Sequence, residues 1–206
     1  MNISTLLFYF IVIVPSAIIH EYAHGWMANR LGDPTAKYAG RLTLDPRSHI
    51  DMWGTVLMPI FLFVVSGGSF LFAYAKPVPF NPYNLKSQKW GPAMVAIAGP
   101  MSNLLLALTF AIVLRFMPFL PPVFWGAAEF ISIIIFANIM LMVFNMVPIP
   151  PLDGSKVLFA ILPDSAYKIK ALLEQYGMIL LLVFILFFIP YITPIIRFIY
   201  LLLIGV

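Results

Sequence analysis

Cysteine is absent from the 206 residues, and only 10% of the residues are charged. The lack of cysteine excludes disulfides and iron–sulfur ligation, so any zinc ion must be held by His, Asp or Glu. Histidine is also scarce, with three in the whole chain. The net charge of +4 is spread over polar segments, and no basic run resembles a nucleic-acid footprint. We therefore expect no nucleic-acid partner.

Apolar residues take the place of the missing charge. They make up 62% of the chain, and the mean hydropathy is +0.99. An ordinary soluble domain has about 45–50% apolar and about 25% charged residues. The composition predicts a multi-pass integral membrane protein surrounded by a lipid bilayer. The whole chain, residues 1–206, would form one membrane-embedded domain.

Long apolar segments predict about five spanning helices in an all-α polytopic fold. The segments cover residues 5–27, 93–116, 130–147, 171–189 and 192–204. The last two are separated by Pro190 and would form a C-terminal helical hairpin within residues 164–206. The core of the domain would then be residues 5–154.

Two further segments predict structure between the first two spans. Residues 52–65 are apolar, but 14 residues form a helix of only about 21 Å, too short for a hydrocarbon core of about 30 Å. They predict a re-entrant hairpin that turns at residues 66–68 and returns through an extended arm, residues 74–82. Residues 37–44 predict a short β-hairpin beside it.

The first apolar segment contains the motif His20-Glu21-Tyr22-Ala23-His24. On a helix the two histidines lie one turn apart on the same face, where two imidazoles can hold one zinc ion. The glutamate between them is placed to act on water at the metal. Ionisable residues within a membrane segment are costly and indicate function.

A catalytic zinc ion needs a third protein ligand. The candidates in the sequence are Asp33, Asp45, His49, Asp51, Glu129, Asp153, Asp164 and Glu174. Asp153 stands out because it follows a span directly, in a proline-rich bend. Irregular backbone at membrane depth is tolerated where it lines a protein-buried or wet cavity. Asp153 could also be a simple N-cap for a helix that begins after it.

Three motifs together resemble the signatures of the site-2 protease family of intramembrane zinc metalloproteases. They are His20-Glu21-x-x-His24, Gly99-Pro100-x-x-Asn103 and Asn145-x-x-Pro148-x-x-Pro151-Leu152-Asp153-Gly154. The resemblance covers residues 20–154, in the family's order, and the chain is similar to the compact class without a PDZ or CBS domain.

The resemblance implies one zinc ion per chain, bound by His20, His24 and Asp153. Glu21 would be the general base and Asn145 a catalytic residue that holds the substrate or the transition state. The substrate would be a transmembrane protein, cleaved in or near its membrane segment after local unwinding. For Asn103 and Asn145, hydrogen bonding between helices is the alternative role. His49 is either a loop histidine or an auxiliary residue of the site.

Basic residues indicate the orientation of the chain. If His20, His24 and Asp153 share one metal, the first and the 130–147 spans end on the same side. With a re-entrant hairpin, one side then carries all but two of the 12 basic residues, Arg115 and Arg197. The positive-inside rule places that side in the cytoplasm. We expect a cell-membrane protein with its N-terminus outside and its active site near the cytoplasmic face.

Another class of protein could use the same residues. A polytopic metal or proton transporter could employ His20, Glu21, His24 and Asp153 as a relay site. Such a protein would need polar residues at several depths, and residues 93–116 and 171–189 carry few. A catalytically inactive scaffold is a second alternative, which the intact glutamate disfavours. The sequence indicates no oligomeric state.

Overall fold

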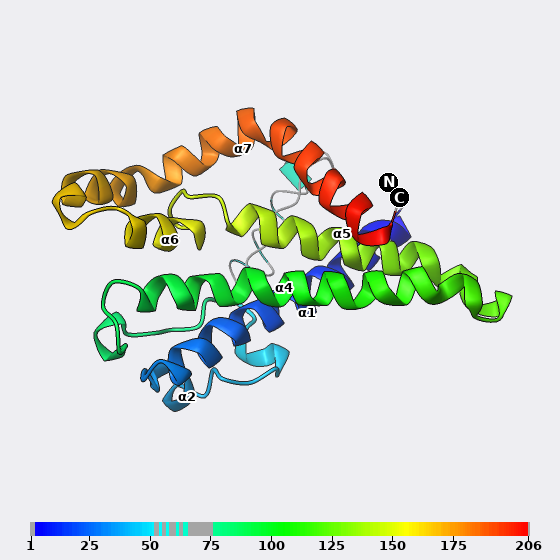
Figure 1. Cartoon of the computed structure of the whole chain (residues 1–206), viewed down its shortest axis with the longest axis horizontal. Coiled ribbons are helices and arrows are strands. Elements are labelled where there is room, and N and C mark those ends of the chain that lie inside the picture. The colour runs from blue at the N-terminus through cyan, green and yellow to red at the C-terminus, as the bar shows by residue number, and fades with distance from the viewer. Residues whose placement is uncertain are drawn as a thin grey trace.

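The computed structural model describes residues 3–51 and 76–205, together with residues 54, 57, 61, 64 and 65. Its described part is dominated by helices (Figure 1). Four are long: α1 (Ile3–Arg30), α4 (Gly91–Phe116), α5 (Ala128–Asn145) and α7 (Tyr167–Ile204). Two are short, α2 (Thr35–Tyr38) and α6 (Gly154–Ile161). The 3₁₀ turns are η1 (Pro46–Ser48), η3 (Pro82–Asn84), η4 (Met117–Phe119), η5 (Pro122–Ala127) and η6 (Asp164–Ala166).

In the described part of the chain, three helical stretches are long and apolar enough to cross a membrane. They cover Gly91–Phe119, Pro122–Asn145 and Asp164–Ile204. Many of their large side chains lie on the outside, such as Leu105 and Leu186, which are 66% and 71% exposed. An exposed apolar surface of this extent suits contact with lipid. The chain is therefore a membrane protein.

Helices α4 and α5 lie side by side, and α7 arches along α5 (Figure 1). Their shared core joins Ala107 and Ala111 of α4 to Ile135 and Ile139 of α5 and Ile196 of α7. The two alanines let the helix backbones approach closely, as is usual between membrane helices. This core fixes α4, which carries one wall of the candidate site.

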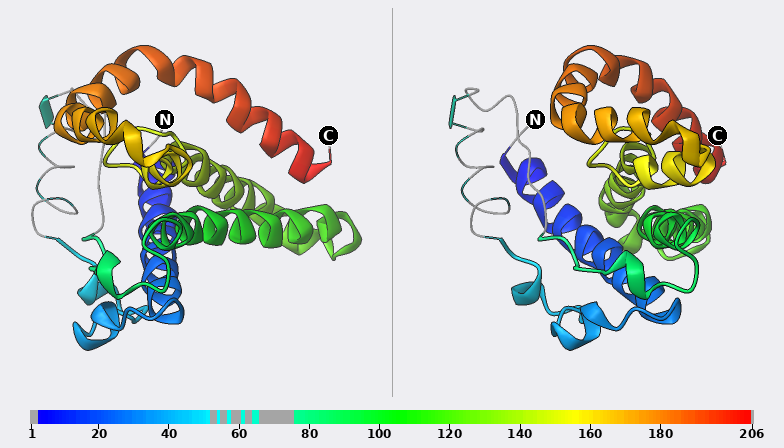
Figure 2. Two further views of the ribbon diagram at one scale, coloured as in Figure 1. Left: turned by 60° about the vertical axis from the view of Figure 1, so that its left-hand side comes forward. Right: turned by 90° about the vertical axis from the view of Figure 1, so that its left-hand side faces the viewer.

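Helix α1 crosses α4 and α5 rather than running along them (Figure 2). Its C-terminal end packs through Ala28 against Leu85 and against Val95 of α4. The polar segments 31–51 and 76–90 surround this end of α1. The crossing brings the middle of α1 against the middle of α4.

Buried Asp33 ties the polar segments together. Its carboxylate accepts hydrogen bonds from the side chain and backbone N–H of Thr35, from Asn81 N–H and from Asn84 Nδ2. Burial acts to raise the pKa of Asp33, but these hydrogen bonds outweigh it and hold the pKa below its ordinary value. Asp33 is thus a structural carboxylate, and it fastens the segment before α4 to the end of α1.

Some details of the predicted fold differ. The count of about five spanning helices is not confirmed, and residues 171–189 and 192–204 lie in one helix, α7, which continues through Pro190 and Pro194. Membrane helices tolerate proline because neighbouring groups satisfy the freed carbonyls. The two segments therefore do not form the predicted hairpin.

The predicted β-hairpin over residues 37–44 is also not confirmed. Residues 35–38 form α2 instead, and Arg41 N–H donates to Ala36 O. Gly40 has a φ of 65°, a left-handed conformation that ends the helical turn. The predicted re-entrant hairpin falls on residues 52–75, most of which lie outside the described residues.

Candidate metal centre

The side chains of His20, His24 and Asp153 meet where α1, α4 and the start of α6 come together. Asp153 Oδ2 lies 3.0 Å from His20 Nε2 and 3.3 Å from His24 Nε2. The two imidazole rings stand nearly perpendicular, with centroids 4.5 Å apart. Within the described residues, this is the one group of three or more His, Asp or Glu side chains that could share a metal ion.

Both imidazoles are oriented through their second nitrogen. His20 Nδ1 is 2.6 Å from Asn103 Oδ1, and His24 Nδ1 is 2.7 Å from the backbone oxygen of Val95. Since both oxygens are acceptors, each Nδ1 carries the proton. In the neutral imidazole, Nε2 then carries the lone pair, on the side of the ring that faces Asp153. Such partners are usual for histidines that bind metal.

Asn103 belongs to a buried polar network across three helices. Its amide nitrogen donates to Asn138 Oδ1 on α5 and to Ser16 O on α1. Asn138 Nδ2 in turn donates to Ser16 Oγ, at 3.1 Å. Both asparagines are fully buried. The amide of Asn103 has a defined direction because both its ends are bonded, so its oxygen is held toward His20.

Gly99 provides the space for the two histidines. A Cβ at this position would lie 2.5 Å from His24 Nε2 and 2.6 Å from His20 Nε2. These distances are far shorter than van der Waals contact, so no larger residue fits without moving the rings. The signature Gly99-Pro100-x-x-Asn103 therefore serves the site twice, through the space at Gly99 and the acceptor of Asn103.

Asp153 occupies the N-cap position of α6 but does not act as a cap. Its side chain makes no capping hydrogen bond and points to the histidines instead. The bend before it contains a cis peptide bond between Pro150 and Pro151. The side chain of Asp153 is 20% exposed, compared with 8% for His20 and 12% for His24. The cluster is therefore buried on the histidine side and more open at the carboxylate.

Glu21 is held by the extended segment before α4. One carboxylate oxygen accepts a hydrogen bond of 2.8 Å from Val78 N–H. Gly25, one turn after Glu21, leaves room for the side chain of Val78. A Cβ at Gly25 would lie 2.9 Å from Val78 Cγ1, so a larger residue would push Val78 away from this position. The bond fixes the position of the carboxylate beside the two histidines of α1.

The remaining predicted residues, Asn145 and His49, direct their side-chain hydrogen bonds away from the cluster. Asn145 ends α5, and its amide donates to Leu141 O, one turn back on the same helix, rather than to a residue of the cluster. His49 is buried rather than solvated; Nε2 donates to Thr43 O, and its backbone oxygen accepts from Lys76 N–H. It organises the loop that leads to the segment holding Glu21.

The donor set fits zinc. Zinc is typically tetrahedral with bonds of about 2.0–2.1 Å to histidine nitrogen and carboxylate oxygen, which places neighbouring donor atoms about 3.3 Å apart. The observed separations of 3.0 and 3.3 Å match this spacing. Two neutral imidazoles and one carboxylate leave a fourth position open, as catalytic sites require.

Comparison with known proteins decides the family. The model of peptidase family M50 matches residues 8–122 and 120–189. The chain belongs to peptidase family M50. This is the site-2 protease family, so the resemblance predicted from the three motifs is confirmed.

Relatives of this M50 protease cover most of the chain. It is 36% identical over 197 residues to "Putative zinc metalloprotease YwhC" of Bacillus subtilis, which covers 93% of this chain and 83% of that protein. It is 31% identical over 170 residues to "Putative zinc metalloprotease Rip2" of Mycobacterium tuberculosis. That match covers 82% of this chain and 62% of Rip2. No solved structure shows a significant match.

The matches confirm that the protein is a zinc metalloprotease. They do not favour the transporter alternative.

Sequence reasoning missed the carbonyl of Val95 and the side chains of Asn138 and Ser16. A backbone carbonyl leaves no trace in a sequence, and the two side chains are ordinary residues of apolar helices. The motif around Asn103 was apparent in the sequence, but the contact of Asn103 with His20 was not.

Proposed function

We propose that this M50 protease hydrolyses peptide bonds in or near the transmembrane segments of membrane proteins. His20, His24 and Asp153 would hold one zinc ion, and Glu21 would be the general base. The observation that carries the proposal is the meeting of two oriented Nε2 atoms and Asp153 Oδ2 in a membrane protein, with Glu21 next to His20 on α1.

Each residue would have a distinct task. Zinc, when bound, supplies Lewis-acid activation of water and of the peptide carbonyl. Glu21 would accept a proton from the attacking water and return it to the leaving amine nitrogen. Asn103 and Val95 O would keep the imidazoles in the tautomer that presents Nε2. Asn145 would bind the substrate backbone through its amide, released from Leu141 O.

The extended segment 76–80 is a candidate to receive an unwound substrate. Neighbouring residues of an extended chain direct their backbone groups to opposite edges. One edge holds Val78 N–H, bonded to Glu21. The other edge carries Pro77 and Pro79, which have no N–H, so it can only accept hydrogen bonds. A substrate strand on that edge would donate its N–H groups to the two proline carbonyls, sharing Pro77 O with the 3.4 Å hydrogen bond from Arg41 Nη2.

The test is Glu21→Gln in the full chain. We expect the purified variant to bind zinc as the wild type does, but to lose cleavage of a transmembrane peptide whose helix is weakened by Pro or Gly. The matched control is Glu129→Gln, in the exposed first turn of α5, which should retain cleavage. Cleavage by Glu21→Gln at the wild-type rate would refute the role of Glu21 and the proposed mechanism.

A further inference from the structure

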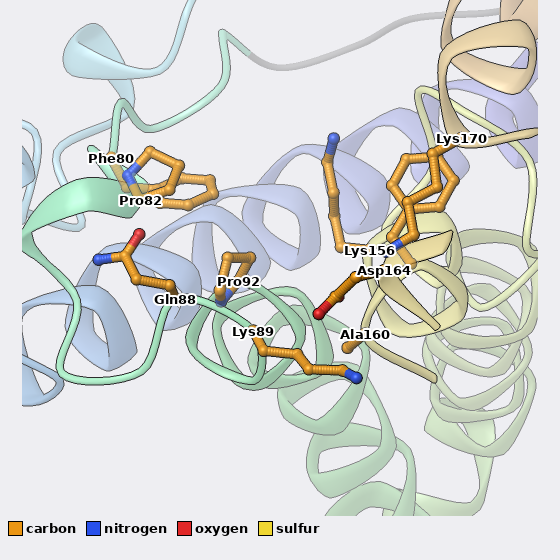
Figure 3. Close-up of a pocket in the computed structure, with 10 residues that line it drawn as sticks. Phe80, Pro82, Gln88, Lys89, Pro92, Lys156, Ala160, Asp164 and Lys170 are labelled. Atoms are coloured by element: carbon orange, nitrogen blue, oxygen red, sulfur yellow. The ribbon is translucent and has the colours of Figure 1, made fainter. Parts of the chain in front are cut away.

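A pocket opens beside the candidate metal centre, with a volume of about 490 Å³. One wall comes from the segment before α4, with Phe80 and Lys89 (Figure 3). The opposite wall comes from α6, η6 and the first turn of α7, with Lys156, Asp164 and Lys170. We call it the lysine pocket.

Both walls of the lysine pocket continue from the candidate active site. On one wall, Phe80 follows two residues after Val78, whose N–H is bonded to Glu21. On the other, Lys156 lies one turn after Asp153, and its N–H donates to Asp153 O. A peptide that leaves the metal centre along these two elements would therefore run toward the pocket.

The charges of the pocket select for an acidic occupant. Three lysines line it against one carboxylate, Asp164. Lys156 Nζ is 3.8 Å from Glu174 Oε1, with both side chains well exposed. Exposed pairs of this kind are weak, so Lys156 can still bind another carboxylate. Its ammonium group also lies 5.6 Å above the ring of Phe159, which keeps it at the wall of the pocket.

Apolar surface accompanies the lysines. Phe80 and Phe159 stand on opposite walls, with Pro82 and Pro92 beside Phe80. A suitable ligand therefore combines acidic side chains with apolar neighbours. A peptide segment at a membrane boundary has this character. A lipid headgroup would also offer negative charge, but the continuity of both walls with the metal centre favours the chain being cleaved.

We propose that the lysine pocket binds acidic side chains of the substrate, in the segment that continues from the scissile bond. The preferred Asp or Glu would lie among the residues that continue from that bond into the pocket. The pocket would thereby select transmembrane substrates with an acidic juxtamembrane segment. The inference rests on the proposed function, because it assumes that a peptide occupies the metal centre.

The experiment is a charge swap on the full chain in nanodiscs. Three peptides share one helix-destabilised transmembrane sequence and carry Glu, Gln or Lys at two positions after the scissile bond. The test variant is Lys89→Glu/Lys170→Glu. The control is Lys37→Glu/Lys168→Glu, which makes the same charge change at exposed lysines outside the pocket. Cleavage is measured as kcat/KM for each peptide.

We expect the wild type to prefer the Glu peptide, and the test variant to lose about tenfold on it. On the Gln peptide the test variant should stay within about twofold of the wild type, and on the Lys peptide it should gain. The wild-type preference should weaken as salt is raised. An equal loss on all three peptides, or an equal loss in the control variant, would overturn the proposal.

Nanodiscs with and without anionic phospholipid distinguish a peptide site from a lipid site. If the test variant loses only the response to anionic lipid, the pocket binds a headgroup and the proposal fails.

Binding of the three fluorescent peptides to the Glu21→Gln protein needs no cleavage, and it separates the pocket from the catalytic step. If the wild type cleaves none of the peptides, the proposed function is at fault, while tighter binding of the Glu peptide that depends on Lys89 and Lys170 still supports the pocket. Equal binding of the three peptides refutes it.

Discussion

Asn103 and the carbonyl of Val95 act on the two histidines in the same way. Each accepts the Nδ1 proton of one imidazole and thereby fixes which nitrogen faces Asp153. Without such a partner a neutral imidazole can place its proton on either nitrogen and can rotate. The cost would appear as weaker metal binding, because the wrong tautomer offers no lone pair.

Asn103→Ala is therefore expected to weaken zinc binding by about 10- to 100-fold, the usual effect of losing such a partner. The measurement is the zinc dissociation constant from competition with a chelator, together with the cleavage rate at saturating zinc. Thr109→Ala is the matched control: Thr109 lies on the same helix, and its hydroxyl donates to Leu105 O, one turn back. Equal zinc affinities for Asn103→Ala and the wild type would contradict this role.

Gly99→Ala tests the space beside the histidines. An alanine in a helix interior is intrinsically more favourable than glycine by about 0.5–1 kcal/mol. The added methyl group would nevertheless lie 2.5–2.6 Å from both imidazoles, so we expect loss of zinc binding with unchanged helix content by circular dichroism. Gly126→Ala, where a Cβ meets no described atom within 4 Å, should bind zinc normally. Full zinc occupancy in Gly99→Ala would show that the rings can move.

Single residues could be predicted from the sequence where the chemistry requires a particular residue type at a particular spacing. His20, Glu21 and His24 sit at helical spacing in an apolar segment, and Asp153 interrupts a proline-rich bend. The structure brings the histidines and Asp153 together. The acceptor from Val95 could not be predicted, because every residue has a carbonyl and only the packing of α4 on α1 selects this one.

Among the connecting elements, the segment before α4 depends on Asp33 for its attachment to α1. Because hydrogen bonds lower the pKa of Asp33, its carboxylate stabilises the fold fully above the ordinary pKa of about 4. That stabilisation is lost as the pH falls through the ordinary value toward the lowered one. Asp33→Asn replaces one acceptor oxygen by an amide that faces donors.

We expect Asp33→Asn to cost about 1–3 kcal/mol of stability at pH 7, since it leaves a buried donor unsatisfied. The difference from the wild type should shrink below pH 4. Thermal unfolding in detergent at a series of pH values measures this difference in stability. The comparison is Asp45→Asn, at the exposed residue that caps η1. A difference that stays constant from pH 7 to pH 3 would contradict the assigned pKa direction.

Secondary-structure elements were harder to predict than single residues where the local sequence favoured two different structures. A β-hairpin was expected over residues 37–44, but Asp33 accepts a hydrogen bond from Thr35 N–H, and a helical turn follows instead. Asp side chains commonly start turns in this way. Pro190 suggested a break, yet α7 continues through it. In a membrane the cost of an unpaired carbonyl is high, so helices persist where soluble ones would end.

For the whole molecule, the arrangement of the helices supports the proposed orientation. The start of α4, the end of α5 and the start of α7 lie at the same end (Figure 1), and the polar segments around the end of α1 lie near them. The lysine-rich segments lie at this end, whereas Arg115 lies near the other end of α4, bonded to the last carbonyls of α7. Because the positive-inside rule favours the cytoplasm for the more basic end, we propose that the first end, with the metal centre, faces the cytoplasm.

The absence of cysteine makes this orientation easy to test, because each introduced thiol is the only one in the chain. We expect Tyr83→Cys and Ser165→Cys to react with a membrane-impermeant maleimide only after the cytoplasmic side is opened. Val123→Cys, at the other end and 82% exposed, should react in intact cells. Labelling of residues 83 and 165 from opposite sides would be incompatible with α4 and α7 both starting at the membrane face of the metal centre. Labelling of both from outside would keep the helix arrangement but reverse the orientation, and would place proteolysis on the outer face.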